Sequence, residues 1–435
     1  MGRVVEFFKK YFRHGQYIQT DDKERKRSNG WFARTFPKFY DKFVFHRPNW
    51  VAVGGPILLG WLIYLLAFMI PEPSRWQLWV SSYTSPEGQV TPYWAMSITM
   101  LFGSMIAGAT SEGGASVAFP VMTLLFGISP AIARDFSLMI QSFGMTASAL
   151  TILYKRLKIE WNALKYATTG AIVGTCLGLS LVAPNIPPPF AKMYFVSVWL
   201  SFAISLFWLN RIHGRQVFLK VPLFNWWKGA VLFLFGFIGG VLTSFAGSGV
   251  DICTFACLTL LFRVNEKTAT PTSVILMAVN SIVGVFYKST IYWGFPCIAR
   301  GMEPVAFNFL IVCVPIVVVG APLGALVSSY LHRLVLAAFV YVTDSAQFIA
   351  AFIIVPQTLQ LALSSVGVVI GGGLLWTFLT FAGGRLQKHV NSQLSEEEIA
   401  EISADHATWG LNHSEEDEKG DVELGAESSS SSDME

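Results

Sequence analysis

Residues 102–126, FGSMIAGATSEGGASVAFPVMTLLF, have a second copy at residues 235–262, FGFIGGVLTSFAGSGVDICTFACLTLLF. Each copy is an apolar segment, a glycine-rich interruption with one acid (Glu112 or Asp251) and a second apolar segment. Paired apolar segments that glycine interrupts at matching points of two halves mark the binding site of secondary transporters. The doubled stretch therefore predicts a transport protein with an internal repeat.

The composition is typical of a helical membrane protein. Hydrophobic residues make up 53% and charged residues 14% of the 435-residue chain, and its mean hydropathy is +0.50. A soluble domain carries roughly 25% charged residues. Runs such as 51–70 supply the about 20 apolar residues that a bilayer crossing needs. Because no short apolar stretch lies in the first 30 residues, we expect 51–70 to act as an uncleaved membrane signal.

The apolar segments follow one another with short gaps. They cover 51–70, 94–110 with 115–128, 135–153, 162–184, 191–210, 229–247 with 250–262, 268–287, 305–327, 334–355 and 362–383. The two interrupted segments are shorter than the about 40 residues that two full passes need. They are predicted to be helix–break–helix hairpins whose bend reaches into the membrane, where protein or a water-filled cavity must surround it.

The repeat has a consistent register. Gly103 and Gly236 are 133 positions apart, whereas Leu124 and Leu260 are 136 apart, so the second copy has three extra residues before its break. Three further spans follow each copy. The fold class predicted is all-α: a polytopic membrane protein with two hairpin-plus-three-span repeats and one extra helix at each end.

Charged loops indicate how the repeats are oriented. With the N-terminus in the cytoplasm, the basic loops 154–161 and 211–228 fall inside, and the uncharged loops 185–190 and 356–361 fall outside, as the positive-inside rule requires. The first hairpin then starts from outside and the second from the cytoplasm, so the repeats are inverted. The exceptions are charged residues on the predicted outer side: Arg134 beside Asp135, and Lys288 with Arg300 near Glu303.

These patterns divide the chain into seven parts. They are a basic cytoplasmic segment 1–50, a first helix with an external loop 51–93, repeat one 94–210, a basic cytoplasmic linker 211–228, repeat two 229–355, a final helix 356–384 and a cytoplasmic tail 385–435. The tail holds 3 Lys and Arg against 14 Asp and Glu. So polar a segment cannot bury enough apolar surface to fold alone, and we expect it to be disordered.

The two breaks are the candidate substrate site. The second half of a broken helix presents unpaired backbone N–H groups and a positive dipole end, which suit an anion. Glycine lets a ligand approach the backbone, and serine adds hydroxyl donors. The candidate substrate-binding residues are Gly113, Gly114, Ser116, Gly247, Ser248 and Gly249, with Gln141 and Asn280 on neighbouring spans. The last two are equally explained as polar contacts between helices.

Three acids lie in or beside apolar segments, where an ionised group is costly: Glu112, Asp251 and Asp344. As proton carriers they would allow a proton to move with the anion. The alternatives are that Glu112 and Asp251 cap their half-helices and that Asp344 anchors two helices. Arg134 is either a gate for the anion or the local ion partner of Asp135. Cys253 and Cys257 share a helix face, but no histidine lies in an apolar segment, so we expect packing and no metal or cofactor.

These residues resemble the TauE/SafE sulfite exporter family, also called TSUP. The resemblance lies in Ala107-Gly108, residues 112–120 (EGGASVAFP), residues 124–130 (LLFGISP) with Ala133, and residues 239–249 (GGVLTSFAGSG) with Ala269. It covers about 94–384 and implies two repeats, transport of sulfite, sulfonates or related organic anions, and substrate-facing glycine turns. The chain departs from the family in Glu112, in Asp251 after Val250, and in Arg134-Asp135.

The sequence therefore predicts a secondary transporter of small anions, with alternating access at a site between inverted repeats and with possible coupling to protons. Its partners would be the anionic substrate, protons and membrane lipid, and we expect no enzymatic activity. The plasma membrane is favoured over an internal one. Two alternatives remain open: a receptor or scaffold that signals through the acidic tail, and an intramembrane aspartyl protease that uses Asp251 and Asp344.

Overall fold

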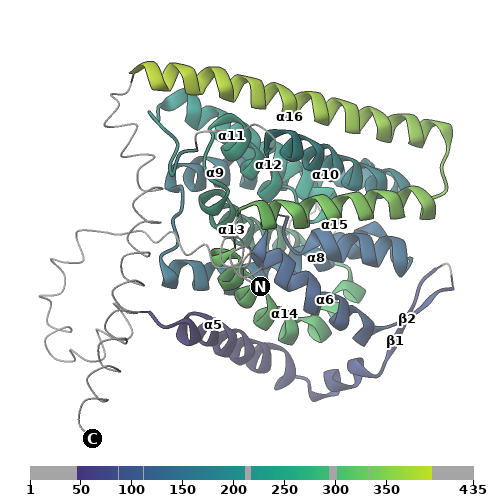
Figure 1. Cartoon of the computed structure of the whole chain (residues 1–435). Helices are drawn as coiled ribbons and strands as arrows, with labels where there is room; N and C mark the ends of the chain where they lie inside the picture. Colours follow the sequence, from purple (N-terminus) through teal and green to yellow (C-terminus); the bar gives the residue numbers. More distant parts are fainter. Residues whose placement is uncertain are drawn as a thin grey trace, which may run out of the picture.

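The computed structural model describes residues 47–86, 88–110, 112–210, 217–292, 301–331 and 333–393, which form a helical bundle with one short β hairpin (Figure 1). Within these ranges, nine helices are long and apolar enough to cross a membrane. The prediction of an all-α polytopic membrane protein is confirmed. The basic segment up to residue 46, Arg300 and the tail from residue 394 lie outside the described residues.

The helices follow the predicted order. Helix α5 (Asn49–Tyr64) precedes the first repeat and α16 (Leu359–Gln393) follows the second. The first repeat contains α6 (Tyr93–Ala109), α7 (Ala115–Pro120), α8 (Pro130–Lys155), α9 (Trp161–Leu177) and α10 (Pro188–Asn210). The second contains α11 (Trp226–Ala246), α12 (Val250–Ala256), α13 (Glu266–Tyr292), α14 (Pro304–Tyr330) and α15 (Arg333–Ile354).

Smaller elements extend or connect these helices. π-Helical turns continue four of them, at Leu65–Met69, Val121–Leu125, Gly178–Val182 and Cys257–Leu261. The 3-10 helices are Pro73–Trp79 and Ala183–Asn185. Strands β1 (Ser82–Thr84) and β2 (Val90–Pro92) pair antiparallel, with Tyr83 opposite Thr91. This hairpin lies at the same end of the bundle as the turn between α15 and α16 (Figure 1), as expected for two loops on one side of a membrane.

The two half-helices have the same local structure. Helix α7 and α12 each end in a five-residue π-helical turn, and the turns begin 136 positions apart. The residues that stop them, Gly127 and Arg263, are also 136 apart, and both are left-handed, with φ of 62° and 55°. With its π turn, each half-helix is about 17 Å long at 1.5 Å per residue, too short for the roughly 30 Å apolar layer of a bilayer. Neither half-helix is therefore long enough to cross a bilayer by itself.

The repeats pack against each other reciprocally. Helix α6 of the first repeat lies against α14 of the second, and α11 of the second lies against α9 of the first. Both contacts use glycine to bring backbones together: a Cβ on Gly108 would overlap the carbonyl oxygen of Ala321, and one on Gly236 would overlap that of Ala167. Close backbone approach through small residues is how helices associate in lipid. Such an exchange of partners is expected of two-fold related repeats, whereas their inversion across a membrane stays a prediction.

Replacing Gly236 with alanine is expected to destabilise the protein by about 2 kcal/mol, because overpacking a tight contact forces the backbones apart. The measurement is thermal unfolding of the purified protein in detergent. Gly54→Ala in α5 is the matched control, since a Cβ there meets nothing within 4 Å. Equal melting temperatures for the two variants would contradict the close approach of α9 and α11.

An aromatic core fixes the first half-helix. The ring of Phe119 in α7 lies 5.0 Å from that of Phe195 in α10, and Phe195 stacks on Trp199 at 4.1 Å. All three side chains are fully buried. Helix α10 therefore holds the short α7, which is too short to be stable by itself.

The chain departs from the expected boundaries at its last helix. Helix α16 continues to Gln393, whereas the final span was expected to end at 384 and the tail to begin at 385. The extension contains Arg385, Gln387 and Lys388, which are good helix formers. A helix has no reason to stop where the apolar run stops, because water tolerates a helical backbone as well as lipid does.

Candidate functional site

The two breaks meet in the interior of the protein. The Ser248 hydroxyl donates to the Glu112 carbonyl oxygen at 3.1 Å. The Gln141 amide of α8 donates to the Gly247 carbonyl oxygen at 2.7 Å. Gly113 has a φ of 72°, and a Cβ there would overlap a carboxylate oxygen of Asp251. Segments that are 136 positions apart in sequence thus form one site, lined by α8.

Asp251 acts as the cap of its own half-helix. Its Oδ1 accepts the backbone N–H groups of Gly249 and Ile252, both at 3.0 Å, and its Oδ2 accepts the Ser248 hydroxyl at 2.7 Å. The Val250 N–H donates to the Thr243 hydroxyl at 3.2 Å. These are the groups that a helix start leaves unpaired. Of the two roles open from the sequence, the contacts favour capping.

This capping changes the expectation for the second break. Gly247, Ser248 and Gly249 were expected to offer free donors to an anion. In the structure the Gly249 N–H and the Ser248 hydroxyl are already bonded to Asp251, and the Gly247 N–H is bonded to the Thr243 carbonyl. A carboxylate of the protein itself occupies the place of an anion. The second break therefore binds an anion only if Asp251 moves away or is protonated.

Glu112 has a different neighbour, Asp344 of α15. Both side chains are fully buried, and their carboxyl groups are neighbours that interact electrostatically. The Thr343 hydroxyl lies 3.3 Å from Glu112 Oε2, and among the described residues neither oxygen of Asp344 has another donor. A hydrogen bond between two carboxyl groups requires a proton on one of them. A shared proton would also avoid two negative charges side by side away from water.

The two acids of the breaks are not equivalent positions. In the 136-residue register of the half-helices, Glu112 corresponds to Ser248, and Asp251 corresponds to Ala115. The hydroxyl of Ser116, one turn into α7, returns to the Gly113 carbonyl at 2.8 Å. The first break thus holds its acid before the glycine and the second holds it after, which accounts for their different contacts.

Helix α8 supplies a polar stripe to the site. Arg134, Ser137 and Gln141 are spaced i, i+3 and i+7, so they share one helix face. The Ser137 side chain and the Arg134 carbonyl lie against Gly247, and Gln141 lies against Gly113 and Gly114. Within the described chain, Ser137 Oγ and Gln141 Oε1 are buried without a hydrogen-bond partner. Unsatisfied buried polar groups beside the breaks are what a polar substrate would complete.

Asn280 has other contacts. Its Oδ1 accepts the hydroxyl of Thr175 at 3.0 Å, which joins α13 to α9. This is the interhelical role that the sequence left open, and the bond joins Asn280 to α9 and not to either break. The Asn280 Nδ2 is buried without a hydrogen-bond partner among the described residues, so its contact with substrate stays a prediction.

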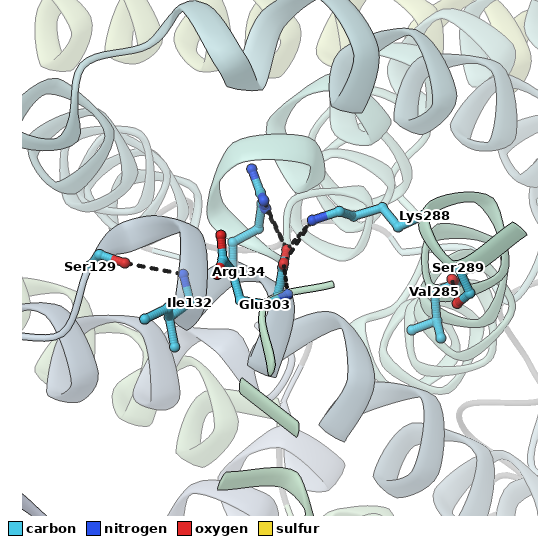
Figure 2. A network of polar contacts seen from close by, with 8 residues as sticks. Ser129, Ile132, Arg134, Val285, Lys288, Ser289 and Glu303 are labelled. Atoms are coloured by element: carbon cyan, nitrogen blue, oxygen red, sulfur yellow. Dashed lines mark hydrogen bonds and ion pairs between the residues drawn. The ribbon is translucent and has the colours of Figure 1, made fainter. Parts of the chain in front are cut away.

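A buried ion network lies where α8 begins, α13 ends and α14 begins. Figure 2 shows Arg134 and Lys288 converging on one carboxylate, which the contacts identify as that of Asp135. Arg134 Nε and Nη2 lie 2.9 Å from Oδ1, Lys288 Nζ lies 2.7 Å from both oxygens, and the Glu303 N–H donates to Oδ2 at 3.0 Å. Asp135 is fully buried. The network joins the two repeats, because α8 belongs to the first and α13 to the second.

A comparison with protein-family models matches residues 95–351 to the family described as sulfite exporter TauE/SafE. The matched region starts in α6 and ends in α15, so it contains both hairpins and both repeats. The chain belongs to the TauE/SafE family. It is therefore an integral, multi-pass membrane transporter. The searches for similar curated proteins and for similar solved structures gave no match.

The family region also contains a residue that the sequence analysis did not select, Lys288. The loop charges contained a signal: Arg134 beside Asp135 and Lys288 near Glu303 were exceptions to the positive-inside rule, and the structure gathers these four residues into one network. Lysine at the end of an apolar span is usually explained by its side chain reaching the interface. Here the Lys288 side chain is only 4% exposed and pairs with Asp135.

A narrow cleft lies at the opposite end of this TauE/SafE fold. It is lined by Gly108 near the end of α6, Ile152 near the end of α8, Lys267 and Thr270 at the start of α13, and Ser328 near the end of α14. Its volume is about 20 Å³, enough for about one water molecule. The cleft reaches α6 one turn before the first break. It is too narrow to admit an oxyanion, so this end must widen if it is part of a transport path.

Proposed function

We propose that the protein is a secondary transporter that moves a small anion, sulfite or an organosulfonate, together with a proton, by alternating access to a site at the two breaks. The substrate class comes from the family, whose described activity is sulfite export. The observation that carries the proposal is the meeting of the two breaks beside a pair of buried carboxyl groups, Glu112 and Asp344. Each break has a hydrogen bond to a residue of the other repeat.

The proton has a defined place in this proposal. With a shared proton, the Glu112–Asp344 pair carries one negative charge; without it, two negative charges would face each other away from water. An anion that enters the site adds a further negative charge nearby. Protonation of the pair offsets part of that charge, so anion and proton bind more favourably together than singly. This thermodynamic linkage is what proton coupling requires.

Alternating access is supported by the arrangement of the ends. The Arg134–Asp135–Lys288 network closes one end of the bundle by joining the repeats, and the narrow cleft marks the other. Movement of one repeat against the other would open these ends in turn. We propose cytoplasmic termini from the loop charges, and a plasma-membrane location. The described residues give no support to the receptor or protease alternatives, and the family consists of transporters.

The proposal predicts flux of a labelled anion into liposomes that contain the purified protein. Sulfite, sulfoacetate, taurine and lactate are to be compared with and without a pH gradient. We expect sulfite or sulfoacetate to enter faster than into protein-free vesicles, and an imposed proton gradient to accelerate uptake. Protein-free rates for all four compounds, with correctly folded protein, would contradict the assignment. Uptake at the same rate with and without the pH gradient would contradict only the proton coupling and would leave anion transport supported.

A further inference from the structure

The ion network at the start of α8 has more donors than its acid uses. Arg134 reaches Asp135 only through Oδ1, whereas Lys288 contacts both oxygens at 2.7 Å. The far end of the Arg134 guanidinium points away from the carboxylate (Figure 2), and that side chain is 13% exposed. Guanidinium has five donors in a planar fork. The network therefore contains a lysine–aspartate pair that neutralises itself and an arginine with donors to spare.

Arg134 also lies at the head of the polar stripe. Its carbonyl oxygen would lie 3.1 Å from a Cβ on Gly247, so this turn of α8 packs directly on the second break. One and two turns further along the same face are Ser137 and Gln141, whose buried oxygens lack partners in the described part of the chain. An anion released from Arg134 toward the bundle centre would next meet these groups and then the breaks.

We propose that Arg134 is the outer binding site for the transported oxyanion and that Asp135 is its tethered substitute, which the anion displaces. This inference rests on the proposed anion transport. Two oxygens of a sulfite or sulfonate group match the guanidinium fork, as carboxylates and phosphates do. Lys288 is a positioning residue: it retains Asp135 through both oxygens while Arg134 turns to the anion. The Lys288–Asp135 pair, which joins α13 to α8, stays in place during this exchange.

The proposal predicts that two single substitutions raise the half-saturating sulfite concentration and that a third lowers it. Arg134→Gln removes the site and raises the half-saturating sulfite concentration about ten-fold or more, the value of a lost charged hydrogen bond. Lys288→Met leaves Asp135 with Arg134 as its sole cation among the described residues, so Asp135 binds Arg134 more tightly and the half-saturating concentration also rises. Asp135→Asn removes the competitor and lowers it. The double variant Asp135→Asn, Lys288→Met returns it to the wild-type value or below, since Arg134 is again free.

The experiment measures labelled-sulfite uptake against concentration in proteoliposomes, together with stabilisation of the purified full-length protein by sulfite in thermal unfolding. Arg75→Gln is the control: Arg75 is also ion-paired, to Glu72 at 2.7 Å, and lies in the loop at the same end but away from the stripe. It should leave both readouts unchanged. Arg134→Lys, which keeps the charge but not the fork, serves if Arg134→Gln does not fold, and should still weaken sulfite binding.

The outcomes separate this inference from the proposed function. Wild-type flux with unaltered half-saturation in Arg134→Gln overturns the outer site and leaves transport intact. A half-saturating concentration that rises in Asp135→Asn, or stays raised in the double variant, shows that Lys288 or Asp135 acts in another way and overturns the displacement. If the wild type transports none of the anions, transport fails, and sulfite-induced stabilisation that Arg134→Gln abolishes still decides whether Arg134 binds the anion.

Discussion

Replacing Asp344 with asparagine is expected to abolish the stimulation of anion uptake by a proton gradient while the protein stays folded. The physical reason is the contact between Glu112 and Asp344 in the buried site. An asparagine amide donates a hydrogen bond to Glu112 without any proton from solution, so the pair no longer gains or loses a proton during the cycle. The ratio of uptake with and without an imposed gradient should fall to unity.

The measurement is uptake of labelled sulfite into proteoliposomes at matched protein content. Thr343→Ser is the control from the same helical turn, since it keeps the hydroxyl that lies 3.3 Å from Glu112 Oε2, and it should retain the gradient dependence. A wild-type response to the gradient in Asp344→Asn would rule out this pair as the coupling site. Thermal unfolding of both variants in detergent verifies that a loss of the response to the gradient is not caused by unfolding of the protein.

Replacing Gly113 with alanine is expected to have the largest effect on the fold of the site. Gly113 is left-handed, with a φ of 72°. A Cβ there would overlap the Asp251 carboxylate and would lie 2.7 Å from Gln141 Oε1 and 2.9 Å from Ser248 Oγ. Backbone strain and overpacking together should cost about 3 kcal/mol. Because the displaced groups are those that join the breaks, transport should be lost even where the protein still inserts.

The matched control for Gly113→Ala is Gly367→Ala in α16. A Cβ on Gly367 meets nothing within 4 Å, and alanine is the better helix former, so this variant should be at least as stable as wild type. Thermal unfolding and sulfite uptake are measured for both. An active Gly113→Ala protein with an unchanged melting temperature would show that the two breaks are not in tight contact.

The comparison of sequence and structure is clearest at the hairpins. The glycine breaks, the half-helices and their 136-residue equivalence were predictable, because each depends on local rules: apolar runs form helices in lipid, and glycine permits left-handed backbone. The pairing of the two breaks followed from the repeat. The role of Asp251 did not, because its oxygens point back to Gly249 and Ile252, and only the geometry of the turn distinguishes a cap from a proton carrier.

The ion network is a second example of contacts that the sequence did not predict. Arg134 and Lys288 were exceptions to the positive-inside rule, each with an acid, Asp135 or Glu303, nearby. That they form one network could not be predicted, since Lys288 and Asp135 are 153 positions apart and belong to different repeats. Polar side chains at such distances find their partners only through the packing of α8, α13 and α14.

The sequence by itself determined the helical membrane fold, the repeat, the family and the location of the breaks. These depend on the periodic distribution of apolar residues and glycine, since every backbone polar group in lipid must be satisfied within its own segment. Tertiary structure alone decided which distant charges meet: Glu112 with Asp344, and Asp135 with Lys288. Electrostatic interactions act through space, and away from water their strength depends on separations of a few ångströms, which only the packed helices set.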